Sequence, residues 1–296
     1  MTTARPRRGA ALLLWLAACG SGLPTDPNPF AGPQAVAIQG YGGDAMEPAL
    51  SPDGQLLFFN DSNAPGADTN LHWAALDTAR PDGLHFTYGG PVTAANGNAL
   101  DAVASLDVHA NLYFISTRSY AETNATVYRS TFGGGVATAP ELVPGLTSAP
   151  PWVIFDAFVS ADGTQLWFAE GNYATGVLGA ASLGLAVRQA DGSFARSPDG
   201  DALLRAVNQP AAAQYAPAVS ADGLELYFTR LTGAGTTAAV YLSRRPNTAS
   251  PWGAAAPIDA LAGGLVEAAT PSADGRALYY HRLVGTTFRI ERVTRD

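Results

Sequence analysis

One short segment occurs five times along the chain, and this repetition constrains the fold more than any other feature of the sequence. The copies read EPALSPDGQLLFF from Glu47, DAVASLDVHANLYF from Asp101, DAFVSADGTQLWF from Asp156, APAVSADGLELYF from Ala216 and AATPSADGRALYY from Ala268. Their shared serines are Ser51, Ser105, Ser160, Ser220 and Ser272, which gives spacings of 54, 55, 60 and 52 residues. Spacings of this size are typical of propeller blades rather than of stacked helical repeats.

Each copy has the composition of a β-hairpin. In four copies the serine is followed by x-Asp-Gly, where the Asp carboxylate accepts backbone N–H bonds and the Gly adopts a positive φ. The second copy has residues 107–111 there instead, so its turn is expected to be one residue longer. The aromatic pairs that follow are Phe58 with Phe59, Tyr113 with Phe114, Trp167 with Phe168, Tyr227 with Phe228, and Tyr279 with Tyr280. Because neighbours on a strand point to opposite faces, each predicted sheet must be covered on both sides.

Two more strands are predicted after most of these hairpins. The third strands are expected at residues 71–76, 127–131, 183–187, 240–243 and 288–293, and the fourth near residues 84–92, 139–143, 203–207 and 256–261. The last copy has no fourth strand, but the β-type segment 34–38 can pair with residues 288–293 and leave no free edge. The prediction is an all-β fold: a five-bladed β-propeller of four-stranded antiparallel blades over residues 34–296, closed by an N-terminal strand.

The shared pattern Pro-x-x-Ser-x-Asp-Gly-x-x-Leu-Tyr-Phe resembles the WD40-like repeat of TolB-type propellers and of many bacterial envelope lipoproteins. The resemblance covers essentially all of residues 34–296. It implies the propeller fold, and it implies little about activity, because the matching residues build hairpins and core.

The N-terminus predicts export. Residues 1–18 have a positive start, with Arg5, Arg7 and Arg8, and then an apolar stretch that is too short to span a bilayer. Residues 16–19 resemble the lipobox of bacterial lipoproteins, which implies that Cys19 becomes the first, lipidated residue of the mature protein. Gly20 favours the outer membrane, and residues 19–33 are expected to form a flexible tether. The alternative is an ordinary secretory signal with an accidental cysteine.

The charge of the mature domain limits its partners. Removal of residues 1–18, which contain three arginines and no acid, changes the formal net charge from −8 to −11 and leaves no lysine. Such a domain is not expected to bind nucleic acid or an anionic lipid surface, so its contact with the membrane should be the lipid alone. The expected partner is another envelope protein or a glycan.

Acidic residues precede the first three hairpins and are the candidate site. Glu47, Asp101 and Asp156 lie four residues before the shared serine, where the innermost strands begin. They are expected to ring the mouth of the central channel, with Trp152 close to Asp156 as part of a ligand site. The last two copies carry Ala216 and Ala268 there, with Tyr215 and Glu267 one step earlier.

Three interpretations of this ring are open. The acids can be structural and accept N–H bonds from turns or from a neighbouring blade. They can hold Ca²⁺, which prefers converging carboxylates and carbonyls, and no other cofactor is expected. They also resemble the three acids of five-bladed arabinanases and fructosidases, which act as base or nucleophile, acid, and pKa modulator. In that case Glu47, Asp101 and Asp156 would be catalytic and Trp152 could stack on a sugar.

The remaining polar residues suggest no other chemistry. His72, His85, His109 and His281 lack metal-ligand spacing and are interpreted as surface or strand-face residues. The favoured hypothesis is an outer-membrane lipoprotein whose propeller lies on the periplasmic face or at the cell surface and binds an envelope protein or ligand without catalysis. The alternative is a propeller glycoside hydrolase that uses the carboxylates at the channel mouth.

Overall fold

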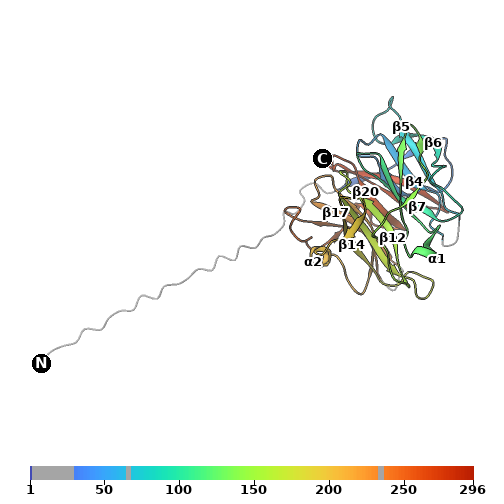
Figure 1. Ribbon diagram of the computed structural model, residues 1–296. Coiled ribbons are helices and arrows are strands. Elements are labelled where there is room, and N and C mark those ends of the chain that lie inside the picture. Colours follow the sequence, from blue (N-terminus) through green and yellow to red (C-terminus); the bar gives the residue numbers. More distant parts are fainter. Residues whose placement is uncertain (2–29, 65–67, 233–236) are drawn as a thin grey trace.

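The computed structural model is nearly all β (Figure 1). It describes Met1 and residues 30–64, 68–232 and 237–296, so residues 2–18 of the predicted signal segment, Cys19 and most of the predicted tether lie outside the described residues. Within these ranges no helix is both long and apolar enough to cross a membrane.

In the described residues most consecutive strands pair as antiparallel hairpins, with two short α-helices and one 3-10 turn between them. Their bounds are β1 Ala31–Ala35, β2 Ala37–Gln39, β3 Met46–Leu50, β4 Leu56–Asn60, β5 Leu71–Leu76, β6 His85–Pro91, β7 Asp101–Leu106, β8 Asn111–Ser116, α1 Tyr120–Thr123, β9 Val127–Gly133, β10 Val136–Ala137, β11 Glu141–Leu142, β12 Trp152–Val159, β13 Gln165–Asn172, β14 Ala181–Arg188, β15 Phe194–Arg196, α2 Gly200–Leu204, β16 Ala213–Val219, β17 Glu225–Thr232, β18 Thr237–Arg244, β19 Ala256–Pro257, η1 Asp259–Leu261, β20 Val266–Pro271, β21 Ala277–Val284 and β22 Thr287–Thr294.

The five sequence copies occupy equivalent places. Each forms the first two strands of a sheet, namely β3 and β4, β7 and β8, β12 and β13, β16 and β17, and β20 and β21. The first strands contact one another in chain order, and β20 also contacts β3. A small void of about 30 Å³ is lined by residues from all five. These five strands are therefore innermost. The third and fourth sheets of the chain are joined by one bridge, from Ala181 to Ala213.

The paired aromatic residues cover both faces of their sheets, as the sequence predicts. Phe58 and Phe59 are fully buried in two different apolar clusters, and so are Tyr227 and Phe228. Each of the five clusters combines residues from two neighbouring copies, and one of them joins the fifth copy to the first. Burial between sheets thus supplies the core, consistent with a chain that has a single cysteine and so no intramolecular disulfide.

The N-terminal segment pairs with the last sheet, but not as one strand. β1 runs antiparallel to β22, with Gln34 opposite Arg292 and Ala35 opposite Glu291. β2 then pairs in parallel with β6, the outer strand of the first sheet. Residues 34–38 are therefore divided between two sheets, because the chain crosses from the edge of the last sheet to the edge of the first before it enters β3. The ordered sheet also begins at Ala31, three residues before the predicted boundary.

The fourth strand predicted at residues 203–207 is wrong. The fourth strand of that sheet is β15, and residues 200–204 form helix α2. Leu204 and Val207 are both fully buried, and the Val207 N–H bonds the Leu204 carbonyl. A helical turn places residues three apart on the same side, so it buries both in one apolar cluster.

The second copy also differs from its expected register. Asp107 takes the structural position of the shared serine. Its Oδ1 atom accepts the Asn111 N–H at 2.9 Å, and in the first copy Ser51 Oγ accepts the Leu56 N–H at 2.9 Å. The turn is consequently one residue shorter, not longer, with Ala110 at φ +62° where the first copy has Gly54 at φ +69°.

This register moves the predicted acid of the second copy. The strand bulge that follows Met46 in the first copy follows Ala102 in the second, so Val103 is the equivalent of Glu47. Asp101 lies two residues earlier than its expected place, because Ser105 is not the equivalent of Ser51.

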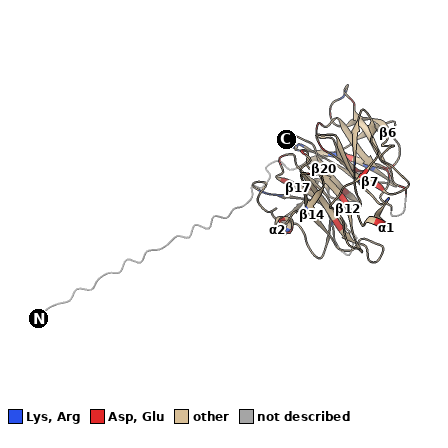
Figure 2. Ribbon diagram, viewed as in Figure 1, with Lys and Arg blue, Asp and Glu red and all other residues tan. Residues whose placement is uncertain are grey.

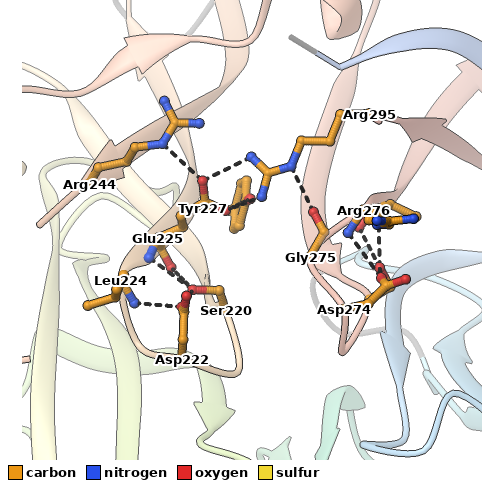
Figure 3. Close-up of polar contacts among 12 residues, drawn as sticks. Ser220, Asp222, Leu224, Glu225, Tyr227, Arg244, Asp274, Gly275, Arg276 and Arg295 are labelled. Atoms are coloured by element: carbon orange, nitrogen blue, oxygen red, sulfur yellow. Dashed lines mark hydrogen bonds and ion pairs between the residues drawn. The ribbon is translucent and has the colours of Figure 1, made fainter. Parts of the chain in front are cut away.

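A polar cluster joins the fourth and fifth copies (Figure 3). Glu225 accepts bonds from Arg295 Nη1 at 2.9 Å and Nη2 at 2.7 Å, from Arg244 Nε at 2.9 Å and from the Tyr227 hydroxyl at 2.5 Å. Arg295 also bonds the Gly275 carbonyl at 2.9 Å. Although burial raises the pKa of Glu225, the bonds from Arg295, Tyr227 and Arg244 lower it overall. This ion cluster ties the C-terminal end of the chain to the preceding sheet.

Candidate functional site

A cavity of about 800 Å³ opens where the innermost strands begin, and all five of them contribute to its wall. We call this end of the molecule the acidic mouth, because Glu47 of β3, Asp156 of β12 and Glu267 of β20 face the cavity. Figure 2 shows acidic residues, in red, close to the labels of β7 and β12. Helix α1 adds Tyr120 to the wall. The acidic mouth therefore collects carboxyl groups from the first, third and fifth copies, and Asp68 adds a fourth to the wall.

Glu47 is held by the strand bulge. It has φ +50° and is 7% exposed. Its N–H donates to His281 Nδ1 at 3.1 Å, and its carboxylate accepts a bond from Asn63 Nδ2 at 2.7 Å. Burial raises the pKa of Glu47, and the charge of Glu267 adds to the rise, while His281 and Asn63 oppose it. Glu47 thus keeps its proton at a higher pH than an ordinary carboxyl group does.

Asp156 is more strongly perturbed. It is 3% exposed, and its Oδ2 atom accepts the Ala216 N–H of the next innermost strand at 2.8 Å. Burial raises the pKa of Asp156 well above its ordinary value, and the neighbouring Glu47 and Glu267 carboxylates raise it further. The bond from the Ala216 N–H matches the structural interpretation of the acids. The raised pKa means that Asp156 also has a proton to donate.

Glu267 behaves in the opposite way. The Tyr215 hydroxyl donates a hydrogen bond to Oε1 of Glu267, and His281 Nε2 lies 3.4 Å from Oε2. Burial alone would raise the pKa of Glu267, but His281 and Tyr215 outweigh it, so the pKa is lowered. Burial and the Glu267 charge raise the pKa of Tyr215, which keeps the phenol protonated as a donor. Glu267 is therefore a carboxylate at neutral pH.

The structure separates Asp101 from the other two predicted acids. Asp101 is fully buried and pairs with Arg118, whose Nη2 atom lies 2.6 Å from Oδ1. The Gly97 N–H donates to its other oxygen at 2.7 Å. Arg118 lines the cavity, whereas Asp101 does not. The prediction that Asp101 faces the channel mouth is wrong, because the register of its strand turns it toward Arg118.

The prediction that Trp152 lies in the ligand site is also wrong. Trp152 begins β12, but its side chain does not line the cavity. Phe155, Tyr173 and Tyr215 line it instead, with the Phe155 ring centroid 5.9 Å from that of Tyr173 and 6.1 Å from that of Tyr215. Burial and the nearby Asp156 raise the pKa of Tyr173 to about 12. An aromatic wall thus stands beside Asp156.

The calcium interpretation of Glu47, Asp101 and Asp156 has no geometric support. Across the described ranges, no group of three or more His, Cys, Asp or Glu side chains is placed to hold a metal ion. Asp101 is committed to Arg118, which removes it from any set of ligands shared with the other two acids.

Sequence reasoning missed the role of His281. It is fully buried and lies opposite Glu267 across the β20–β21 hairpin, rather than on the surface. Unbroken pairing from Thr270 and Tyr279 would place Ala268 opposite His281, and the bulge between Glu267 and Thr270 shifts that register by one residue. The sequence predicts the hairpin that contains His281. It does not predict the bulge, so it does not show that Glu267 is the residue opposite the histidine.

A second cavity, of about 450 Å³, lies at the other end of the innermost strands, which we call the turn mouth. It is lined by repeat turns, including Ser160, Asp162, Ser220, Asp222 and Ser272. In these turns each serine hydroxyl donates to the Asp two residues later, at 2.6 Å in the third, fourth and fifth copies. The polar groups of the turn mouth largely satisfy one another.

Comparison with known proteins identifies the fold but no family. No protein-family model matches the chain, so the WD40-like resemblance stays a prediction, and no curated protein matches either. Among solved structures, the chain is similar to an endo-arabinase from Bacteroides thetaiotaomicron, with 11% identity, a TM-score of 0.54, and coverage of 88% of this chain and 96% of that one.

Two further solved structures are similar to the chain over most of its length. A family 117 glycoside hydrolase from Zobellia galactanivorans has 12% identity and a TM-score of 0.53, with 91% of this chain and 90% of that chain covered. The catalytic domain of a GH62 α-L-arabinofuranosidase from Coprinopsis cinerea has 14% identity and a TM-score of 0.52, with 90% and 96% covered. The chain therefore has a β-propeller fold.

Proposed function

We propose that the domain is a glycoside hydrolase whose active site is the acidic mouth. The observation that carries this proposal is that one cavity holds carboxyl groups whose pKa values are displaced in opposite directions, Asp156 upward and Glu267 downward. Glycoside hydrolysis uses such a pair, one carboxyl group that keeps its proton and one that has lost it. The likeness of the fold to an endo-arabinase, a family 117 glycoside hydrolase and a GH62 α-L-arabinofuranosidase supports the same conclusion.

The proposed roles follow from the two environments. Asp156 is the general acid and gives its proton to the glycosidic oxygen as the bond to the anomeric carbon breaks. Glu267 is the carboxylate that attacks the anomeric carbon or takes a proton from the attacking water, and the Tyr215 hydroxyl orients it. Glu47 raises the pKa of Asp156 by its proximity. Asp101, which the sequence also offered, has no part in this set because it is paired with Arg118.

The cavity wall indicates the class of glycan. A volume of about 800 Å³ falls in the range of ligand sites, and Phe155 and Tyr173 offer aromatic surface to a sugar ring. Asp68 and Glu267 bring negative charge to the wall, while the positive charge of Arg118 is compensated by Asp101. An anionic sugar would be repelled, so the proposed substrate is a neutral glycan.

We also infer that the domain is a five-bladed propeller with the β1–β22 pairing as its closure. The support is the succession of five innermost strands, each in contact with the next, and of five apolar clusters that each join two neighbouring copies.

The lipid anchor remains part of the proposal. The lipobox-like residues 16–19 support export and attachment to the outer membrane through Cys19. In a Gram-negative host, the wild type should partition with membranes and Cys19→Ser should not. Equal partition of the two proteins would remove the anchor from the proposal without affecting the active site.

A non-catalytic envelope-binding module is the second candidate function. The observation that favours it is the bond from the Ala216 N–H to Asp156, which gives this acid a structural reason to be present. Under that hypothesis the acidic mouth would bind a glycan or protein and leave it intact.

Hydrolysis of a glycan panel separates the two candidates. The panel contains neutral furanosides, neutral pyranosides and uronides. The wild type should cleave a neutral member, and Asp156→Asn and Glu267→Gln should each lower kcat by at least about 100-fold. Asp222→Asn, at the turn mouth, is the control that should keep wild-type kcat. Binding without cleavage by the wild type, or equal cleavage by all four proteins, would contradict the hydrolase.

A further inference from the structure

We propose that His281 is a positioning residue for the reaction, one ring nitrogen being fixed by the Glu47 backbone so that the other orients the Glu267 carboxylate. The inference rests on the proposed hydrolase function. It assigns to His281 a role beyond strand packing.

The hydrogen bond to Glu47 determines which ring nitrogen carries the proton. The Glu47 N–H donates to His281 Nδ1 at 3.1 Å, so Nδ1 is an acceptor and has no proton. In a neutral imidazole the proton is then on Nε2. Nε2 is the nitrogen that lies 3.4 Å from Glu267 Oε2. The backbone of the first copy thereby aims an N–H group at a carboxylate of the last.

The ring has little freedom to turn away. His281 is fully buried, and the Phe288 ring packs against it with centroids 5.4 Å apart and planes at 79°. Among the described residues, His281 Nε2 makes no hydrogen bond, and Glu267 Oε2 lies 3.4 Å from it. A buried N–H group without a partner is destabilising, so the Glu267 carboxylate is the acceptor expected for it when the site tightens around a substrate.

The other copies show that the backbone bond does not need a histidine. Asn60 Oδ1 accepts the Val103 N–H at 3.1 Å, and Thr229 Oγ1 accepts the Ala268 N–H at 3.0 Å. These two N–H groups belong to residues equivalent to Glu47, each with a positive φ. An amide or hydroxyl oxygen is therefore sufficient for the structural bond. His281 alone adds a second nitrogen, and that nitrogen faces the cavity carboxylate.

Four titratable groups surround Glu267. Tyr215 of β16 and His281 of β21 favour its charged form, while Glu47 of β3 and Asp156 of β12 bring further carboxyl groups. Loss of His281 would leave Tyr215 as the single donor and would raise the pKa of Glu267. A residue that only packs in the hairpin would not change that pKa.

His281→Asn separates positioning from packing. The asparagine oxygen can still accept the Glu47 N–H, just as Asn60 Oδ1 accepts the Val103 N–H. The asparagine has no nitrogen that reaches Glu267. We expect the acidic limb of the pH profile of kcat/KM to move up by about one pH unit and kcat to fall about 10-fold. A carbon-13 titration of the Glu267 carboxyl should show the same upward shift.

His72→Asn is the matched control, since His72 is another buried histidine next to a carboxylate, with Nε2 3.2 Å from Asp61 Oδ2 outside the cavity. It should leave the acidic limb in place. An unchanged acidic limb and an unchanged Glu267 titration in folded His281→Asn would overturn the inference.

Two measurements keep the inference testable if other steps fail. If the wild type cleaves no glycan, the proposed function is wrong, while the Glu267 titration still tests the position of His281. If His281→Asn does not fold, nitrogen-15 spectra of the wild type report the tautomer. A proton on Nε2 supports the inference, and a proton on Nδ1 overturns it.

Discussion

The two mouths of the innermost strands are built from the same repeat but differ in how uniform they are. At the turn mouth, Ser220 Oγ donates to Asp222 at 2.6 Å and accepts the Glu225 N–H at 2.9 Å (Figure 3), and the third and fifth copies repeat these bonds. At the acidic mouth the three carboxyl groups accept bonds from different donors: Asn63 for Glu47, the Ala216 N–H for Asp156 and Tyr215 for Glu267.

The two mouths also differ in the pKa values of their carboxyl groups. Burial would raise the pKa of Asp162, but bonds from Ser160 and Thr164 outweigh it and lower that pKa. Bonds from Ser272 and the Arg276 N–H lower the pKa of Asp274, so both turn carboxylates are stabilised as charged groups. At the acidic mouth burial raises the pKa of Asp156 and Glu47. The regular end stabilises the fold, and the irregular end holds carboxyl groups in states that a catalyst can use.

The largest expected effect is on stability near the turn mouth. Arg295→Ala removes the two-pronged partner of Glu225, whose side chain is 12% exposed, and leaves that carboxylate with Arg244 and Tyr227. The free energy of unfolding should fall by about 3 kcal/mol, measured by urea denaturation. Activity per folded molecule should not change. Arg276→Ala, at an exposed arginine nearby, should cost less than about 0.5 kcal/mol.

The second effect is on catalysis at the acidic mouth. Tyr215→Phe removes the hydroxyl that donates to Glu267, so the carboxylate loses both orientation and charge stabilisation. We expect kcat to fall about 30-fold, equivalent to about 2 kcal/mol, in steady-state assays on the cleaved glycan. Tyr280→Phe, which removes a bond of 2.8 Å to Glu291 outside the cavity, should keep wild-type kcat. Similar losses of kcat in both variants would mean that the bond from Tyr215 to Glu267 has no special role in catalysis.

The third effect compares one turn with the whole fold. Ser220→Ala leaves the Glu225 N–H without its hydroxyl acceptor, and should lower the free energy of unfolding by about 1 kcal/mol. Because the bond lies at the turn mouth, kcat should stay at the wild-type value. A loss of activity larger than the loss of folded protein would link the turn mouth to catalysis.

The smallest effect concerns pH and Asp156. The folded state raises the pKa of this group, so it binds the proton more tightly than the unfolded chain and wild-type stability falls as pH rises through the interval between the two pKa values. Asp156→Asn does not titrate and keeps an oxygen for the Ala216 N–H. Its Tm should exceed that of the wild type by about 1–2 °C at neutral pH, and the difference should vanish in acid. A lower Tm at neutral pH would contradict the raised pKa.

Much of the fold could be predicted because local patterns determine it. The strand predicted at residues 71–76 has the same bounds in the structure, and the paired aromatic residues divide between neighbouring clusters as expected. The exceptions arose at one turn, where a different residue type makes the turn's hydrogen bonds, and at one segment that forms a helix in place of a strand. Asp107 replaced a serine and moved a register by two residues, and Leu204 and Val207 gained burial from a helix where a strand was expected.

The site was predictable only in part. Glu47 and Asp156 face the cavity as their repeat position suggests, because the innermost strands of the first and third copies keep their register. Asp101 does not, since its register and Arg118 remove it. The pairing of Glu267 with His281 depends on a bulge that adds one residue to a strand. A sequence pattern records the residues of a hairpin but not the bulge that decides which of them meet.

The position of a bound sugar tests the proposed active site most directly. The measurement is a crystal structure of Asp156→Asn soaked with the glycan that the wild type cleaves. The account predicts a sugar across the acidic mouth, with its glycosidic oxygen within hydrogen-bond reach of the substituted side chain at position 156 and its anomeric carbon facing Glu267. A sugar bound at the turn mouth alone, or at another surface with the acidic mouth empty, would contradict it.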